Sequence, residues 1–248
     1  MNDTKKLIII PTYNEISNIQ QLLEEIYKVQ NDVHILIVDD NSPDGTGQLI
    51  DKLIENNTFN NQLFVMHRAG KLGLGTAYVA GFKWGIENGY DVFLSMDADF
   101  SHNPIYLPQI FQAMKENDLV IGSRYVKGGG VKDWGVDRIF ISRGGNIYAQ
   151  IVLLANVKDL TGGFNCYHRK FLEKINLDSI MSNGYCFQIE MKFRHILLKA
   201  KIKEIPIIFA DRTKGVSKMS GNIFKEAVIN VLKLSLMRSK IKEQMNAN

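Results

Sequence analysis

The feature that most constrains the fold is a regular alternation of strand and helix patterns in the first half of the chain. Short segments rich in Ile, Val and Leu alternate with longer segments whose apolar residues recur at helical spacing. The expected strands are 6–10, 33–38, 63–66, 92–96 and 118–122, and the expected helices are 16–29, 48–54, 76–87 and 104–114. This alternation predicts an α/β fold with a mostly parallel sheet and helices on both faces.

The second half of the chain is less regular. Residues 127–137 are rich in glycine and are expected to form a mobile loop, and Pro206 places the strand expected at 202–209 at a sheet edge. The other expected elements are helices at 139–154, 188–199 and 222–237. We therefore expect one α/β domain over 1–210, followed by a basic mobile loop and an amphipathic helix within 211–248.

Basic residues are concentrated near the C-terminus. Residues 201–248 hold 10 Lys or Arg and 4 Asp or Glu, although the whole chain has a net charge of only +4. A basic end on a nearly neutral body indicates an anionic partner, or simply a solvated helix face. The amphipathic helix could lie in the interface of an anionic bilayer or pack on the core.

Three observations bear on location. No segment reaches the roughly 20 apolar residues of a membrane span, and the N-terminal residues lack a signal-peptide core. Cys166 and Cys186 have no metal-binding or redox spacing, which fits a reducing compartment. We expect a cytoplasmic protein, or one at the cytoplasmic face of a membrane.

Two carboxylates, Asp97 and Asp99, directly follow the strand expected at 92–96. Ligands of parallel sheets bind beyond the carboxyl ends of the strands, so both should lie in a ligand crevice. Like charges this close need a cation, and Mg²⁺ or Mn²⁺ shared with diphosphate oxygens would supply it. A polar turn would also contain such a pair; the position after an apolar strand favours the metal site.

The first two expected strands also end in polar motifs. Asp40, in VDDNSPDGT, could accept hydrogen bonds from a nucleoside, although Asn, Pro, Asp and Gly also form turns. In PTYNE, Tyr13 and Glu15 could contact a base, and Thr12 with Glu15 also fits a helix capping box.

The three motifs PTYNE, VDDNSPDGT and DADFSHNP occur in this order, each at the end of an expected strand. In this the chain resembles the family 2 inverting glycosyltransferases with the GT-A fold, a Rossmann-like α/β fold. The stretches GLGTAYVAGF, IGSRY, ISRGGN, DLTGGFNCYHR, YCFQIEM and DRTKGVSKM look like dolichyl- or polyprenyl-phosphate mannose synthases without C-terminal membrane helices. The resemblance implies metal-dependent transfer of mannose from GDP-mannose to polyprenyl (dolichyl) phosphate, with inversion to a β-linked product.

The resemblance also implies roles for individual residues. The guanosine part would be held by Pro11, Tyr13, Glu15, Val38 and Asp40. The metal and diphosphate would be held by Asp97, Asp99, the Ala98 backbone and Ser101, which stands where some relatives carry a Gln ligand. Arg124, Arg138 and Arg143 would bind the acceptor phosphate, and Arg212 and Lys218 would clamp donor and acceptor. Catalysis would then rest on Asp99, Arg124, Arg212 and Lys218.

The implied chemistry suits these residue types. A lipid phosphate is already an anionic nucleophile, so positioning and charge stabilisation replace a general base. The five histidines show no catalytic-triad spacing, although His102 lies close to the expected metal site. The implied partners are the two substrates and either a membrane surface or a small membrane-embedded subunit, with no nucleic acid.

The residues disfavour most alternative functions, although they do not exclude a different sugar donor. A UDP-sugar donor, as in a polyprenyl-phosphate glucosyltransferase or another family 2 enzyme, is not excluded by base-reading chemistry. A nucleotidyltransferase would carry a glycine- and Lys/Arg-rich segment after the first strand, which PTYNE lacks. A nicotinamide enzyme would need G-x-G-x-x-G there. A non-catalytic scaffold would not need the intact set of charged residues.

Overall fold

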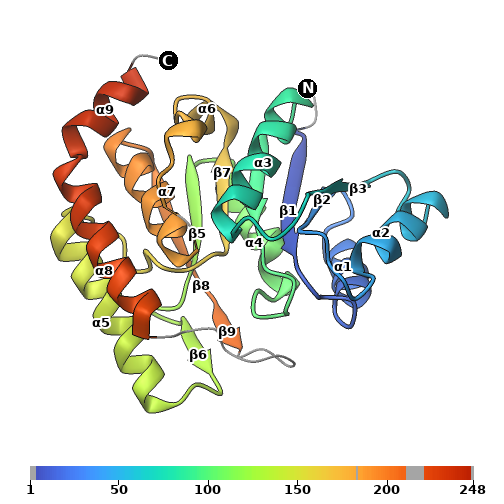
Figure 1. Ribbon diagram of the computed structural model, residues 1–248, viewed down its shortest axis with the longest axis horizontal. Coiled ribbons are helices and arrows are strands. Elements are labelled where there is room, and N and C mark those ends of the chain that lie inside the picture. The colour runs from blue at the N-terminus through green and yellow to red at the C-terminus, as the bar shows by residue number, and fades with distance from the viewer. Residues whose placement is uncertain (1–3, 183, 211–220, 247–248) are drawn as a thin grey trace.

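The computed structural model describes residues 4–182, 184–210 and 221–246, without the side chains of 185, 221–227 and 246. A seven-stranded sheet in the order β3-β2-β1-β4-β7-β5-β8 forms the centre (Figure 1). Its strands are β1 (Lys6–Thr12), β2 (His34–Asp39), β3 (Leu63–His67), β4 (Val92–Ser95), β5 (Leu119–Ser123), β7 (Asn165–His168) and β8 (Ile202–Pro206). The α/β prediction is confirmed, and all five strands expected in the first half are present.

Helices cover both faces of this sheet. Those of the first half are α1 (Ile19–Val29), α2 (Thr46–Glu55), α3 (Leu74–Glu87), the 3-10 turn η1 (Pro104–Tyr106) and α4 (Leu107–Met114). Those of the second half are α5 (Val136–Leu153), α6 (Arg169–Leu172), η2 (Leu177–Ser179), α7 (Tyr185–Leu197), α8 (Gly221–Leu236) and α9 (Arg238–Asn246). The side chain of Asn103 caps the N-terminus of η1, with Pro104 in its first turn.

The strict alternation of side chains along β1 separates two hydrophobic cores. Ile8 and Ile10 belong to the core that includes residues of α1, α2 and α4, whereas Leu7 and Ile9 belong to the core that includes residues of α3, α5, α7, α8 and α9. On the second face α3 lies very close to β1, since a Cβ on Gly81 would come within 2.6 Å of Ile9. Figure 1 shows α8 running beside α5 and α7 on this side of the molecule.

One strand interrupts the parallel arrangement. β7 lies between β4 and β5 and is antiparallel to both, whereas the other neighbouring pairs of the sheet are parallel. The sequence pattern did not identify β7, which is only four residues long. Its insertion connects the two halves of the sheet and brings residues just before it towards the carboxyl ends of β4 and β5.

Two expectations for the second half are wrong. The single strand expected at 202–209 is two strands, because β8 ends at Pro206 and β9 (Ile208–Ala210) leaves the main sheet. β9 pairs in parallel with β6 (Gly130–Lys132), so the glycine-rich segment expected to be a loop contains a strand. The predicted edge position of β8 is confirmed.

The C-terminal segment contains two helices, α8 and α9, where the sequence predicts one. The basic loop 211–220 lies outside the described residues, so the division at residue 210 stays a prediction. Among the helices the structure describes, none is long and apolar enough to cross a membrane.

Candidate active site

The carboxyl ends of β2, β1 and β4 lie next to one another, and the polar motifs follow these ends. β5 ends on the same side, beyond the antiparallel β7. Motifs that are far apart in the chain therefore meet at one edge of the sheet. This is the edge where α/β sheets bind ligands.

The outer part of this edge holds Asp40, Tyr13 and two basic residues. Arg68 Nη1 lies 3.0 Å from Asp40 Oδ1, and only 8% of each side chain is exposed. Burial raises the pKa of Asp40, and Arg68 and the Leu72 backbone N–H partly oppose that rise. Lys71 Nζ lies 4.4 Å from the centre of the Tyr13 ring. Sequence reasoning missed Arg68 and Lys71, although both flank the glycine-rich turn directly after β3.

The neighbouring Asp39 has a structural role. Its carboxylate accepts hydrogen bonds from the Thr12 hydroxyl (2.9 Å), the Ser42 hydroxyl (2.6 Å) and the Ser42 backbone N–H (3.0 Å). The Thr12 hydroxyl thereby links the ends of β1 and β2 and does not cap a helix, so its capping-box interpretation is wrong. Glu15 instead accepts from Asn18 Nδ2 at 3.0 Å, just before α1. The turn interpretation of VDDNSPDGT is therefore confirmed, and the nucleoside-binding role of Asp40, Tyr13 and Glu15 stays a prediction.

Three further residues expected at the site are apolar and have little exposed side chain. Pro11 is half-buried and pairs in register with Val38, whose side chain is fully buried in the core. Ala98 is 4% exposed between the two carboxylates. Because its side chain is buried, Val38 could contact a ligand only through its backbone.

Asp97 and Asp99 lie in the loop after β4. Asp97 Oδ1 accepts a hydrogen bond from the hydroxyl of Tyr78 on α3 at 3.2 Å, and its side chain is 33% exposed. Burial and the nearby Asp97 raise the pKa of Tyr78, so its hydroxyl stays protonated as a donor. Asp99 Oδ1 accepts from the Ser101 hydroxyl (2.6 Å) and the Ser101 N–H (3.1 Å). Ser101 therefore orients Asp99.

His102 supports the same loop from beneath. Its Nδ1 accepts the backbone N–H of Asp97 at 2.9 Å, and its ring stacks on Phe164 at a centroid distance of 4.9 Å. A backbone N–H can only donate, so the ring proton sits on Nε2. Burial lowers the pKa of His102, although both aspartates oppose this. A neutral, fixed imidazole suits positioning of Asp97 better than proton transfer.

The two carboxylates fit a divalent cation that shares its coordination with a ligand. Among the described residues, no group of three or more His, Cys, Asp or Glu could form a closed metal cage. Mg²⁺ typically binds through one or two carboxylates plus substrate phosphate oxygens. An open pair such as Asp97 and Asp99 matches that donor set.

Arg124, at the end of β5, is held by a carboxylate that sequence reasoning missed. Its Nε and Nη2 each donate to Asp159 at 2.7 Å, and its backbone N–H donates to the same group at 3.0 Å. Burial alone would raise the pKa of Asp159, but the charge and hydrogen bonds of Arg124, together with the charge of Lys192, hold that pKa far below its usual range. Nη2 also donates to the Thr161 hydroxyl at 2.7 Å. The DLTGGF stretch was the available signal for this partner.

The other predicted cations occupy different places. Arg138 on α5 is half-buried and lies 4.0 Å from the centre of the Trp134 ring, whereas Arg143 is exposed. Arg212 and Lys218 lie outside the described residues, so their predicted roles stay predictions.

A cavity of about 170 Å³ brings most of the inner residues together. Its lining includes the polar residues Asp97, Asp99, Ser101, His102 and Arg124, and also Arg138, but not Arg143. The helices α5 and α8 add Ile141, Tyr148, Val228 and Val231 to the same lining. The cavity thus combines charged groups with apolar groups from α5 and α8.

A comparison with known families agrees with this geometry. Residues 7–176 match the model of "Glycosyl transferase family 2". The chain belongs to that family. The resemblance read from the motifs is therefore confirmed.

Two relatives cover most of this family 2 chain. Polyprenol monophosphomannose synthase of Mycolicibacterium smegmatis is 45% identical over 228 residues, covering 92% of this chain and 85% of the relative. Undecaprenyl-phosphate mannosyltransferase of Micrococcus luteus is 46% identical over 230 residues, covering 93% of each.

Solved structures show the same fold at low identity. Mannosyltransferase PcManGT of Pyrobaculum calidifontis, solved with GDP-Man and Mn²⁺, has a TM-score of 0.59 at 13% identity and covers 98% of this chain and 73% of that one. Glucosyl-3-phosphoglycerate synthase of Mycobacterium tuberculosis, solved with Mn²⁺, UDP and glucosyl-3-phosphoglycerate, has a TM-score of 0.62 at 16% identity and covers 95% and 79%. The predicted GT-A architecture is confirmed.

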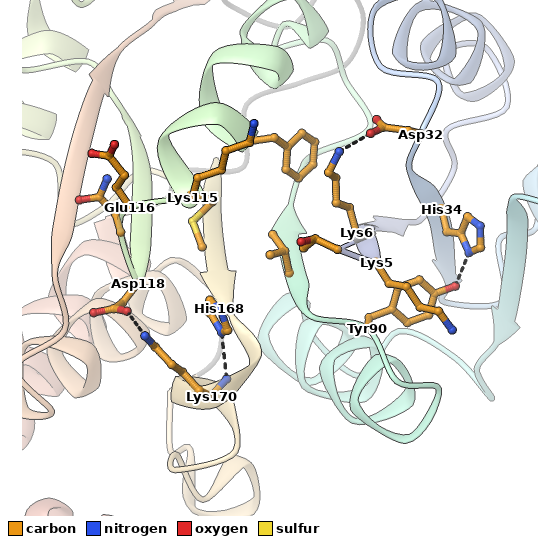
Figure 2. A pocket seen from close by; sticks show the side chains of 15 residues that line it. Lys5, Lys6, Asp32, His34, Tyr90, Lys115, Glu116, Asp118, His168 and Lys170 are labelled. Atoms are coloured by element: carbon orange, nitrogen blue, oxygen red, sulfur yellow. Dashed lines mark hydrogen bonds and ion pairs between the residues drawn. The ribbon is translucent and has the colours of Figure 1, made fainter. Parts of the chain in front are cut away.

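A larger cavity of about 810 Å³ lies at the opposite end of the sheet, where β1, β2, β4 and β5 begin. Figure 2 shows two charged pairs in its lining, Lys6 with Asp32 and Lys170 with Asp118. None of the three motifs reaches it. Size alone therefore does not identify the reaction site of this glycosyltransferase.

Proposed function

We propose that this enzyme transfers mannose from GDP-mannose to polyprenyl phosphate and forms a β-linked lipid-phosphate mannose. The observation that carries the proposal is the cavity whose lining combines Asp97 and Asp99 with apolar residues of α5 and α8. A sugar nucleotide needs the charged groups, and a lipid phosphate needs both charged and apolar groups. The names of the two relatives at 45% and 46% identity support mannose and a polyprenyl phosphate as substrates.

The donor would lie across the carboxyl ends of the strands. Its nucleoside would meet Tyr13, Glu15 and Asp40, and its diphosphate would reach Asp97 and Asp99. These two carboxylates would hold Mg²⁺ or Mn²⁺, which supplies charge stabilisation for the leaving diphosphate. Tyr78 and Ser101 keep the carboxylates in place through their hydrogen bonds.

The acceptor would enter from the α5–α8 side. Its phosphate is the nucleophile and needs no general base, which suits a neutral His102. Arg138 lines the cavity and would attract this phosphate. Asp159 keeps the guanidinium of Arg124, which lines the same cavity, in a fixed orientation. A fixed cation stabilises charge without reorganisation during the reaction.

The surface around this entrance supports peripheral contact with a membrane. α5 exposes large apolar side chains, which is unfavourable on a surface that faces only water. The most exposed on α5 and just beyond its end are Val136, Phe140, Ile147, Ile151 and Leu154, and α8 adds Ile229, Leu232 and Leu236. A bilayer surface would cover these residues and deliver the lipid acceptor to the cavity.

One assay tests the proposal and its UDP-sugar alternative. The protein is incubated with labelled GDP-mannose, UDP-glucose or UDP-GlcNAc, together with polyprenyl phosphate and Mg²⁺ or Mn²⁺, and the lipid is extracted. We expect label in the organic phase only with GDP-mannose. Labelled lipid from a UDP-sugar alone would replace the proposed donor.

A further inference from the structure

Gln188 on α7 is a cavity residue without a role in the site described above. Gln188 is only 3% exposed, and it lines the same cavity as Asp97 and Asp99. A buried amide is unfavourable unless its donors and acceptor are satisfied. The orientation of this amide therefore decides what it can bind.

The neighbouring Asn165 determines that orientation. Asn165 Nδ2 donates to the carbonyl oxygen of Gly162 at 2.9 Å, and a carbonyl can only accept. The same Nδ2 donates to Gln188 Oε1 at 2.9 Å, and the Tyr167 hydroxyl adds a longer contact of 3.4 Å to that oxygen. The oxygen of Gln188 is therefore occupied, and its nitrogen is the polar atom available to a ligand.

That nitrogen is buried and has no hydrogen-bond partner within the described part of the chain. A Cβ built on Gly163 would lie 3.6 Å from Gln188 Nε2 and 3.2 Å from His102 Cε1. The absence of a side chain at Gly163 thus leaves space between the amide and the imidazole that supports Asp97. A buried donor left unpaired costs about 1–3 kcal/mol, so its retention beside a cavity points to a ligand acceptor.

We propose that Gln188 Nε2 donates a hydrogen bond to a hydroxyl oxygen of the transferred sugar and so helps determine which sugar is accepted. This inference rests on the proposed function, because it places the donor diphosphate at Asp97 and Asp99. The sugar follows the diphosphate, so it would lie next to these carboxylates and over Gly163. A neutral amide suits a hydroxyl, whereas the phosphates already have arginines.

The first test separates sugar contact from nucleotide contact. Gln188→Met removes the donor, and we expect kcat/KM for GDP-mannose to fall about 10- to 100-fold, the loss of one buried hydrogen bond to substrate. Affinity for GDP alone should stay within about twofold, since GDP lacks the sugar. An equal loss of GDP affinity would overturn the proposal.

A variant at a second glutamine of the fold excludes a nonspecific effect of the substitution. Gln150→Met is the matched control, because Gln150 Nε2 donates to the Lys158 carbonyl outside the cavity. It should behave like the wild type. A Gln188→Met protein with wild-type activity, or one whose loss is matched by Gln150→Met, would refute the assignment.

Monodeoxy donors identify the hydroxyl. The analogue that lacks the contacted hydroxyl should be used equally poorly by the wild type and by Gln188→Met, because both lack the same hydrogen bond. A full additional loss with every analogue would contradict a direct contact. If the wild type uses a UDP-sugar instead, the proposed function fails separately. Gln188→Met, assayed with that UDP-sugar and with UDP alone, then decides this inference by the same criteria.

Discussion

Replacing Asp159 by Asn should destabilise the protein strongly, because Asp159 is the counter-ion of the buried Arg124. The exposed fractions of the two side chains are 0% and 7%. Asp159 Oδ2 accepts from both the backbone N–H and Nε of Arg124, while Oδ1 accepts from Nη2 and from the Gly162 N–H. In either orientation an asparagine amide would turn its NH₂ towards two donors.

The expected cost is about 3–5 kcal/mol, the range for breaking one side of a buried ion pair. This is a large part of the roughly 5–15 kcal/mol that stabilises a typical domain. For a chain of this size it corresponds to a fall in Tm of about 6–20 °C. Urea unfolding followed by circular dichroism, with the slope checked for constancy, measures the difference.

The surface pair Asp118–Lys170 supplies the matched control. Its Nζ and Oδ1 atoms lie 2.6 Å apart, but the lysine side chain is 55% exposed. Asp118→Asn should therefore cost at most about 1 kcal/mol. A loss in Asp159→Asn no larger than in this control would refute the reasoning. So would a double variant, Arg124→Met with Asp159→Asn, that is no more stable than Asp159→Asn alone.

The same pair predicts a pH dependence. The pKa of Asp159 is lower in the folded state than the unfolded value of about 3.9, so its contribution is fully present above roughly pH 4. The contribution is lost as the pH falls below that value towards the folded pKa. The stability difference between wild type and Asp159→Asn should therefore narrow in acid. A difference that stays constant down to pH 2 would contradict this linkage.

Three other predictions concern the reaction and the membrane. Asp97→Asn or Asp99→Asn should lower turnover at least about 100-fold, and EDTA should abolish transfer; full activity in EDTA would exclude the metal. Arg138→Ala should raise the apparent KM for polyprenyl phosphate more than Arg143→Ala does, since only Arg138 lines the cavity; the reverse order would move the acceptor site. Phe140→Asp, at a side chain 74% exposed on α5, should weaken sedimentation with anionic vesicles while leaving the Tm unchanged; unaltered binding would exclude this face.

The sequence predicted the first half of the fold well because its signals are local. Ile8 and Ile10 alternate with Leu7 and Ile9 inside a single strand, and the cap at Asn103 requires only neighbouring residues. Placement of Asp97 and Asp99 at the ligand edge followed from the same logic. Parallel strands joined by helices end on one side of a sheet whatever their exact order.

The second half depended on pairings between distant segments. β6 and β9 are each three residues long and become strands only through each other. β7 is recognisable only once it lies between β4 and β5. Such short segments carry too few residues for a period to be distinguished from a turn.

What the sequence by itself determined was the α/β class, the family and the identity of the carboxylates at the strand ends. What only the tertiary structure decided was which of these polar groups are already satisfied. Arg124 and Asp159 are 35 residues apart, and Asn165 and Gln188 are 23 apart. Hydrogen bonding at such separations depends on how the chain brings the segments together in space, which local periodicity does not predict. The roles of Asp159 and Gln188 could therefore be identified only from the folded protein.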